Sequence, residues 1–513
     1  MIIFEWVLGI LLGAVLLSAL ARQMRVPYPA LLALGGAVLA LIPGAPRIVL
    51  EPELALALFV APVLLDAAYD TSPRDLRDNW FPVTSLVLMA VGLTTGAVAV
   101  VAHALTGMPW AAAIALGAIV APPDAAAATV VLRQVNLPHR IVTILEGESL
   151  LNDASALLIY RVAVTAMAAG SITLSSAAPT FVQSIVGSVI VGPLLAIAYM
   201  RSVALLHKSG DAPSNIILQF IGTFGVWLLA DRLGLSGILT IVAYAITIAR
   251  RAPSMTPARL RVPSYAVWET AVFVLNVLAF VLIGLQIGPI FEGLAPAQRI
   301  RYLLVATAIL ATVIVVRFAW VMSYNAAARW RIRRVGFHPR RPMMAPTVKG
   351  AIVISWCGMR GIVTLVAALA LPDGFPDRDL IVFVAFCVVL GTLLVQGLTL
   401  RPLLLALNLH DDDPVGREVA RARTIAYQAA LASLDGDQSR LAKALRVELE
   451  HALAHANEAA ADAAVGASAD SLRLRAVNAA RQAVLAMRRS GEIGDAAFHR
   501  LEEEMDRVEL SAT

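Results

Sequence analysis

The sequence predicts an all-α polytopic membrane protein, and three observations support this fold class. Of its 513 residues, 59% are hydrophobic and only 15% are charged, which gives a mean hydropathy of +0.77. The apolar residues gather in segments of about 20, the helix length that crosses a bilayer. These segments lack the two-residue alternation of a membrane barrel, so helices are expected.

About 13 transmembrane helices are predicted before residue 410. The first has no Lys or Arg before its apolar run, so we expect it to be retained rather than removed as a signal peptide. The predicted spans cover residues 3–21, 28–43, 52–69, 80–106, 108–132, 141–169, 178–200, 214–231, 235–249, 265–288, 302–328, 347–371 and 380–407.

Basic residues in the connecting loops predict the orientation. The loops that follow odd-numbered spans hold 19 Lys and Arg residues up to Lys349, whereas the other loops hold five. The richer set is therefore expected in the cytoplasm, with the N-terminus outside and the C-terminus inside. Because topology explains the net charge of +5, we expect no nucleic acid partner.

A composition change at HDDDP divides the chain into a transmembrane domain, 1–409, and a cytosolic helical C-terminal region, 410–513. From residue 411 onward there are 13 basic and 18 acidic residues, with apolar residues at helical spacing. Three or four amphipathic helices are expected. The alternative is a solvated tail with marginal structure.

The fifth predicted span is interrupted by Pro122 and Pro123. Proline lacks the amide donor of a helix, so the helix should unwind there and expose carbonyl groups. Asp124 follows, where a carboxylate complements the positive end of the second half-helix.

The twelfth span is interrupted by WCGMRG at 356–361. Gly358 and Gly361 permit a break, and Arg360 can neutralise the negative end of a half-helix. Seven spans separate the two breaks, as expected for inverted repeats. Broken helices in corresponding halves indicate the binding site of a carrier.

The sixth span carries three carboxylates, and two of them have simple explanations. Glu148 is predicted to form a structural ion pair with Arg317, which lies in the otherwise apolar eleventh span. Glu146 lies nearer the cytoplasmic end and can reach water. Cys357 and Cys387 also fall within spans, where we interpret them as packing residues without a disulfide or zinc site.

Asp153 is the deepest acid of this span and the candidate functional residue. Helical spacing places it beside Asn152 and Ser149, with Asp124 and Asp66 as further oxygen donors. Burial disfavours an ionised carboxylate and a bound cation favours it, so a proton and a small cation compete for one such group. If the carrier changes face only when this group is neutralised, exchange follows.

GESLLNDASALLIY, the APPD and GMRG interruptions and the thirteen-span layout together resemble the monovalent cation/proton antiporters, specifically the electroneutral sodium/proton exchangers of the bacterial NhaP type. The resemblance covers about residues 1–407, and MRRSGEIGDAAFHRLEEEMD in the tail is similar to bacterial members. It implies a pH-regulating homodimer in the bacterial inner membrane, without cofactors. Glu148 and Arg317 would match the family's buried ion pair, and Arg360 its helix-break arginine.

The resemblance also implies that Asp153 binds Na⁺ or H⁺, completed by Asp124, Ser149 and Asp66. Asn152 stands where electrogenic relatives have a second aspartate, which implies one-for-one exchange. Two departures affect this site. Many exchangers have Thr-Asp-Pro where this chain has Pro-Asp-Ala from residue 123, and many have glutamate in place of Asp66.

Several alternatives stay open at this point. Asp153 can be a purely structural polar contact, and Na⁺, Li⁺ and K⁺ ask for the same oxygen ligands, so a K⁺/H⁺ antiporter is the main rival. A cation channel would need an open polar pore, whereas isolated acids beside broken helices favour alternating access. The chain contains neither GxSxG nor HExxH, and no enzyme activity or transition metal is expected.

Overall fold

The protein is described here by a computed structural model. It describes residues 2–24, 26–42, 51–124, 128, 132, 137–169, 174–206, 212–255, 258–292, 296–336, 345–409, 414–436, 439–459, 480, 482–484 and 486. All regular structure in these residues is helical. The chain forms two compact units, Met1–Asp411 and Asp412–Thr513.

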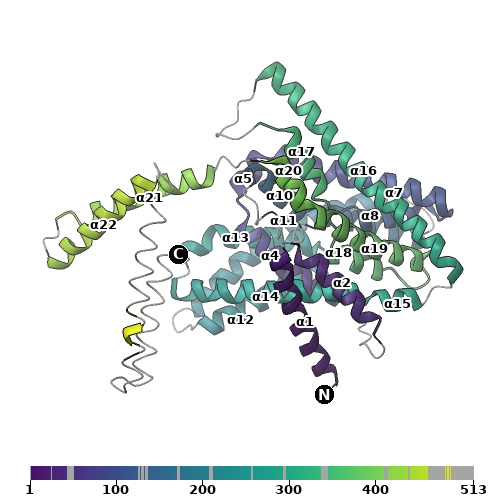
Figure 1. The fold of residues 1–513 in the computed structure, drawn as a ribbon, viewed down its shortest axis with the longest axis horizontal. Coiled ribbons are helices and arrows are strands. Elements are labelled where there is room, and N and C mark those ends of the chain that lie inside the picture. The colour runs from purple at the N-terminus through teal and green to yellow at the C-terminus, as the bar shows by residue number, and fades with distance from the viewer. Residues whose placement is uncertain are drawn as a thin grey trace. The chain divides into compact units, whose positions relative to one another are not determined.

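The first unit contains most of the described helices (Figure 1). They are α1 (Ile2–Met24), α2 (Tyr28–Ala40), α3 (Pro52–Ala55), α4 (Ala61–Asp70), α5 (Pro73–Asp78), α6 (Trp80–Thr84), α7 (Val91–Thr106), α8 (Trp110–Val120), α10 (His139–Ala169), α11 (Leu174–Leu206), α12 (Ala212–Arg232), α13 (Gly237–Met255), α14 (Ala258–Leu285), α15 (Ile287–Glu292), α16 (Pro296–Val335), α17 (Val348–Trp356), α18 (Ile362–Leu369), α19 (Arg378–Thr392) and α20 (Leu398–Leu407). Three π-helical turns join neighbouring helices: η1 (Leu56–Val60), η2 (Ser85–Ala90) and η3 (Leu393–Gly397).

The all-helical membrane fold agrees with the prediction. Within the described residues, nine helical segments are long and apolar enough to cross a membrane. The other four predicted spans contain α2, α8, α13 and the pair α17 and α18. The first two of these are apolar but shorter, at 13 and 11 residues. Length and composition therefore do not establish the exact count of 13.

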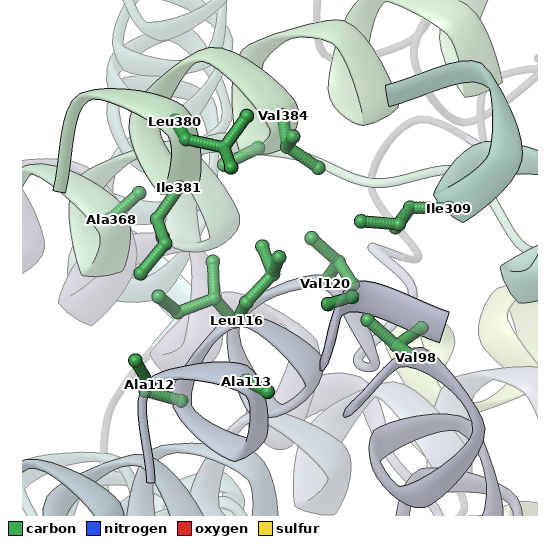
Figure 2. Close-up of a cluster of buried hydrophobic side chains, with 14 of the residues drawn as sticks. Val98, Ala112, Ala113, Leu116, Val120, Ile309, Ala368, Leu380, Ile381 and Val384 are labelled. Carbon is green, nitrogen blue, oxygen red and sulfur yellow. The ribbon is translucent and has the colours of Figure 1, made fainter. Parts of the chain in front are cut away.

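The helices of the first unit pack in two groups. In the first group, α7, α8, α10, α16, α17, α18 and α19 contact one another. In the second group, α1, α2, α4, α11, α12, α13 and α14 do so. Figure 2 shows the core of the first group, where Val98 of α7, Leu116 of α8, Ile309 of α16, Ala368 of α18 and Ile381 of α19 meet. This core surrounds α8 and thereby positions the break that follows it.

Small residues allow close backbone packing in the second group. A Cβ atom added at Gly36 of α2 would collide with the carbonyl oxygen of Val281 in α14. One added at Gly284 of α14 would collide with the carbonyl oxygen of Ala33. Membrane helices associate largely through such packing, because lipid supplies no hydrophobic driving force between them.

The second unit contains α21 (Pro414–Ser433) and α22 (Arg440–Ala459), which pack against each other. Arg446 Nη2 donates a hydrogen bond to the carbonyl oxygen of Leu434 at 2.9 Å, which ties α22 to the end of α21. Almost all of the remaining predicted tail, from residue 460 onward, lies outside the described residues.

Candidate functional site

The two predicted helix breaks meet in the structure. The first follows α8, which ends at Val120, and the second lies between α17 and α18. The backbone N–H of Asp124 donates a hydrogen bond to the carbonyl oxygen of Met359 at 2.6 Å. The two interrupted segments therefore contact each other directly at their breaks. Most of the fifth span beyond Asp124 lies outside the described residues.

Arg360 supplies the hydrogen bonds that the end of α8 lacks. Its Nε donates to the carbonyl of Val120 at 2.9 Å and its Nη2 to that of Ala121 at 3.0 Å. The side chain is 1% exposed, so its positive charge acts on the negative end of the α8 dipole in a dry environment. Its backbone N–H donates to Thr392 Oγ1 of α19 at 3.0 Å, which fixes the break against a third helix.

Asp124 lies beside the start of α18, on the far side of the second break from α17. A Cβ atom added at Gly361 would overlap the Asp124 Oδ2 atom and lie 2.5 Å from its Cγ atom. Gly361 is the residue immediately before α18. The carboxylate therefore faces the positive end of α18. The second half-helix of the fifth span, whose start Asp124 is predicted to occupy, lies largely outside the described residues. Arg360 of the twelfth span thus lies at the negative end of α8, and Asp124 of the fifth span lies at the positive end of α18.

The absence of a side chain at Gly361 gives a testable prediction. Gly361→Ala should lower the stability of the protein by about 1–3 kcal/mol, because the added methyl group overpacks the Asp124 carboxylate. Gly92→Ala and Gly96→Ala in α7 are matched controls, since an added Cβ meets nothing within 4 Å there. Thermal melting of the purified variants measures this. Equal melting of Gly361→Ala and the controls would contradict the close approach.

Glu148 and Arg317 form a bidentate ion pair between α10 and α16. Arg317 Nη1 donates to Glu148 Oε1 at 2.5 Å, and Nη2 donates to Oε2 at 2.8 Å. Glu148 is 1% exposed and Arg317 is 2% exposed. Arg317 Nη2 also donates to the carbonyl of Ile354 at 3.0 Å, so the same guanidinium caps the end of α17. The sequence predicted the ion pair but not this second role.

Asn152 extends the ion pair. Its Nδ2 donates to Glu148 Oε1 at 3.1 Å, and the residue is completely buried. Its Oδ1 atom is buried without a hydrogen-bond partner among the described residues. The amide is therefore held by the structural acid Glu148, with one oxygen left available.

Asp153 is half-buried on α10, and Ser149 lies one turn before it, also half-buried. Asp66, on α4, lines a cavity whose wall includes none of Asp153, Asp124 and Ser149. The role of Asp66 in a cation site thus stays a prediction.

Glu146 and the two cysteines lie outside the contacts described above. Glu146 is half-buried on α10. Cys357 and Cys387 are free thiols, and both pack in hydrophobic clusters of the first unit.

Known proteins resemble this chain in sequence and in fold. The sequence model of the sodium/hydrogen exchanger family, transmembrane part, matches residues 7–406. A Mycobacterium tuberculosis protein named as an uncharacterized Na⁺/H⁺ exchanger is 33% identical over 537 residues, which cover 98% of this chain and 95% of the relative. A Bacillus pumilus sodium, potassium, lithium and rubidium/H⁺ antiporter is 34% identical over 399 residues, which cover 74% of this chain and 58% of the relative.

The fold of this chain is similar to that of an antiporter of known structure. The sodium proton antiporter MjNhaP1 from Methanocaldococcus jannaschii at pH 8 matches with a TM-score of 0.59 and 17% sequence identity. The match covers 79% of this chain and 99% of that protein.

A bundle of membrane helices in which two helix breaks meet beside buried charges is the arrangement of a secondary transporter. The chain belongs to the sodium/hydrogen exchanger family. It is a membrane transporter and not an enzyme, as the sequence predicted.

Proposed function

We propose that the protein exchanges Na⁺, and also Li⁺, for H⁺ one for one by alternating access. The observation that carries the proposal is the neighbourhood of Asp153. Five residues earlier on the same helix, Glu148 is neutralised by Arg317, whereas Asp153 forms no ion pair with any residue that the structure describes. A half-buried acid in such a place favours neutralisation by a proton or by an alkali cation. Asp153 is the ion-binding carboxylate, and Ser149, Asp124 and Asp66 are further cation ligands.

The neutral Asn152 supports the one-for-one ratio. It donates to Glu148, whose charge is already balanced, and adds no titratable group beside Asp153. A cycle that carries one Na⁺ in one direction and one H⁺ in the other moves no net charge. The carrier acts as a homodimer in the bacterial inner membrane, with its N-terminus outside and its C-terminus in the cytoplasm. It regulates pH and requires no cofactor.

Vesicles that contain the purified protein test the substrate. An imposed acid-inside pH gradient quenches a permeant amine dye, and Na⁺, Li⁺ or K⁺ is then added outside. Saturable dequenching with Na⁺ and Li⁺ is expected, and linear, non-saturating flux would instead indicate a channel. A second candidate, K⁺/H⁺ exchange, is favoured by the name of the Bacillus pumilus relative, which includes potassium. Dequenching with K⁺ alone would select it.

The charge balance is tested in the same vesicles. A gradient of permeant thiocyanate imposes a membrane potential without adding another cation. For a one-for-one cycle, the initial rate of Na⁺-evoked dequenching should stay the same within about twofold, because no net charge crosses the field. A rate that rises or falls steeply with the potential would show an electrogenic ratio.

A further inference from the structure

A polar stripe runs along the last predicted span, which is otherwise mostly apolar. Its members are Thr392 at the end of α19, Gln396 in the π-helical turn η3 and Thr399 in α20 (Figure 1). They are four and three residues apart, so they lie on one face of the helix, about one turn from each other. Buried polar residues inside membrane spans are usually functional, and the proposed exchange site does not include Gln396.

The two threonines of the stripe hold the interrupted twelfth span on both sides of its break. Thr392 Oγ1 accepts a hydrogen bond from the backbone N–H of Arg360 at 3.0 Å, shortly before α18 begins. Thr399 Oγ1 accepts a hydrogen bond from Trp356 Nε1 at 2.9 Å, where α17 ends. Gln396 lies between these two contacts on the same helix face, so it faces the break itself.

The residue after Gln396 agrees with this position. A Cβ atom added at Gly397 would lie 3.2 Å from Met359 Sδ and 3.4 Å from Cγ of Pro27. Met359 belongs to the break between α17 and α18, and Pro27 immediately precedes α2. Gln396 therefore lies in the region where η3, the second break and the start of α2 come together.

The side-chain amide of Gln396 has no protein partner at either end. The residue is 0% exposed, and neither Nε2 nor Oε1 has a hydrogen-bond partner among the residues that the structure describes. Most buried polar side chains are paired, because leaving one unpaired costs the whole desolvation of the group. An amide that is buried and unpaired at both ends indicates a ligand that the protein does not itself supply.

The chemistry of the amide identifies this ligand. Nε2 can only donate hydrogen bonds, and Oε1 can only accept them. A cation would satisfy Oε1 alone, and an anion would satisfy Nε2 alone. A water molecule both accepts and donates, and buried waters typically make about three hydrogen bonds to polar groups of this kind. The two ends of the amide together therefore favour water over any ion.

From these features we propose that Gln396 binds a buried water molecule, which joins its amide to the backbone of the second break. An interrupted helix leaves N–H and C=O groups that its own turns cannot pair, so the break offers further partners for this water. Gln396 is thus a positioning residue. It acts on the break through water, whereas Thr392 and Thr399 contact the interrupted span directly.

X-ray radiolysis of the intact protein in detergent tests the proposal. Hydroxyl radicals that form from a bound water oxidise the side chains beside it, and methionine sulfur reacts readily. Met359 and Met108 are both buried, at 0% and 1% exposed, but only Met359 lies beside the proposed water. Met359 should therefore form sulfoxide at least about fivefold faster than Met108, as measured by mass spectrometry of peptides.

Variants then assign this oxidation to the amide. Gln396→Leu removes both hydrogen-bonding ends and should lower the oxidation rate of Met359 to that of Met108. Ser355→Ala is the matched control, because Ser355 is 1% exposed on α17 and its hydroxyl already donates to the carbonyl of Ala351 at 2.8 Å. In this control Met359 should be oxidised as in the wild type.

Thermal melting distinguishes a hydrated amide from a dry one. If water pairs the amide, Gln396→Leu loses those hydrogen bonds and should melt at the wild-type temperature or below it. A dry, unpaired amide would instead make the leucine variant melt at a higher temperature, because its replacement removes a buried group without a partner.

The proposal is overturned by any of three results. These are equal oxidation of Met359 and Met108 in the wild type, an unchanged oxidation rate of Met359 in Gln396→Leu, and a higher melting temperature of that variant. The first comparison needs no variant, so it holds even if Gln396→Leu fails to fold. None of the measurements uses ion flux, so their outcome is independent of whether the protein exchanges Na⁺ for H⁺.

Discussion

Asp153→Asn should abolish cation-evoked dequenching in vesicles for Na⁺, Li⁺ and K⁺ alike, down to the level of vesicles without protein. The amide keeps the size of the side chain but can neither release a proton nor carry the charge that holds a cation. The variant should fold normally, because the amide is nearly isosteric with the carboxyl group of this half-buried residue. Its melting temperature is therefore expected to be close to that of the wild type.

Glu146→Gln is the matched control for this experiment. Glu146 is half-buried on the same helix, two turns before Asp153, and lies nearer the predicted cytoplasmic end. Its variant should keep exchange within a few-fold of the wild type. If Asp153→Asn still exchanges ions while its melting is normal, the exchange site lies elsewhere in the molecule.

Breaking the Glu148–Arg317 pair should produce the largest loss of stability. Removal of one partner of a buried ion pair costs about 3–5 kcal/mol, since it leaves the other charge uncompensated. Arg317→Met should be more severe than Glu148→Gln, because Arg317 also caps the carbonyl of Ile354. The double variant Glu148→Met and Arg317→Met should lose less than the sum of the single losses.

The native cysteines allow a direct measurement of this effect. Cys357 is buried and Cys387 is partly buried, so a thiol-reactive dye reports their exposure as the protein melts. Arg331→Met is a control on the same helix, because Arg331 is exposed and its variant should melt as the wild type does. Normal melting of Glu148→Gln together with changed ion preference would instead assign Glu148 to the cation site.

Local chemistry in the sequence predicted where the helices break and which acid needs a partner. The Pro-Pro step after Ala121 and the two glycines around Arg360 each act on their own backbone, so they are visible without a structure. A lone arginine in the apolar eleventh span likewise predicted the pair with Glu148, and the two side chains do meet.

The assignment of charges to helix ends needed the tertiary structure. Arg360 caps α8, which lies 240 residues away in sequence, and Asp124 faces the start of α18. Local sequence indicates that each charge can stabilise a helix end, but only the tertiary structure shows that Arg360 lies at the end of α8 and Asp124 at the start of α18. The position of Asp66 depends in the same way on how α4 packs among α11 to α14.

The polar ties around the helix breaks have a mechanical consequence. They join α8, α10, α16, α17 and α19 into one piece, since they run from Glu148 to Arg317, from Arg360 to Val120 and Thr392, and from Asp124 to Met359. The contact of α18 with η1 and α14 is apolar instead, because Phe59 of η1 and Ala279 of α14 pack on Val366 of α18. Apolar contacts have no preferred direction, so a displacement at that contact would cost less than a displacement within the tied group of helices.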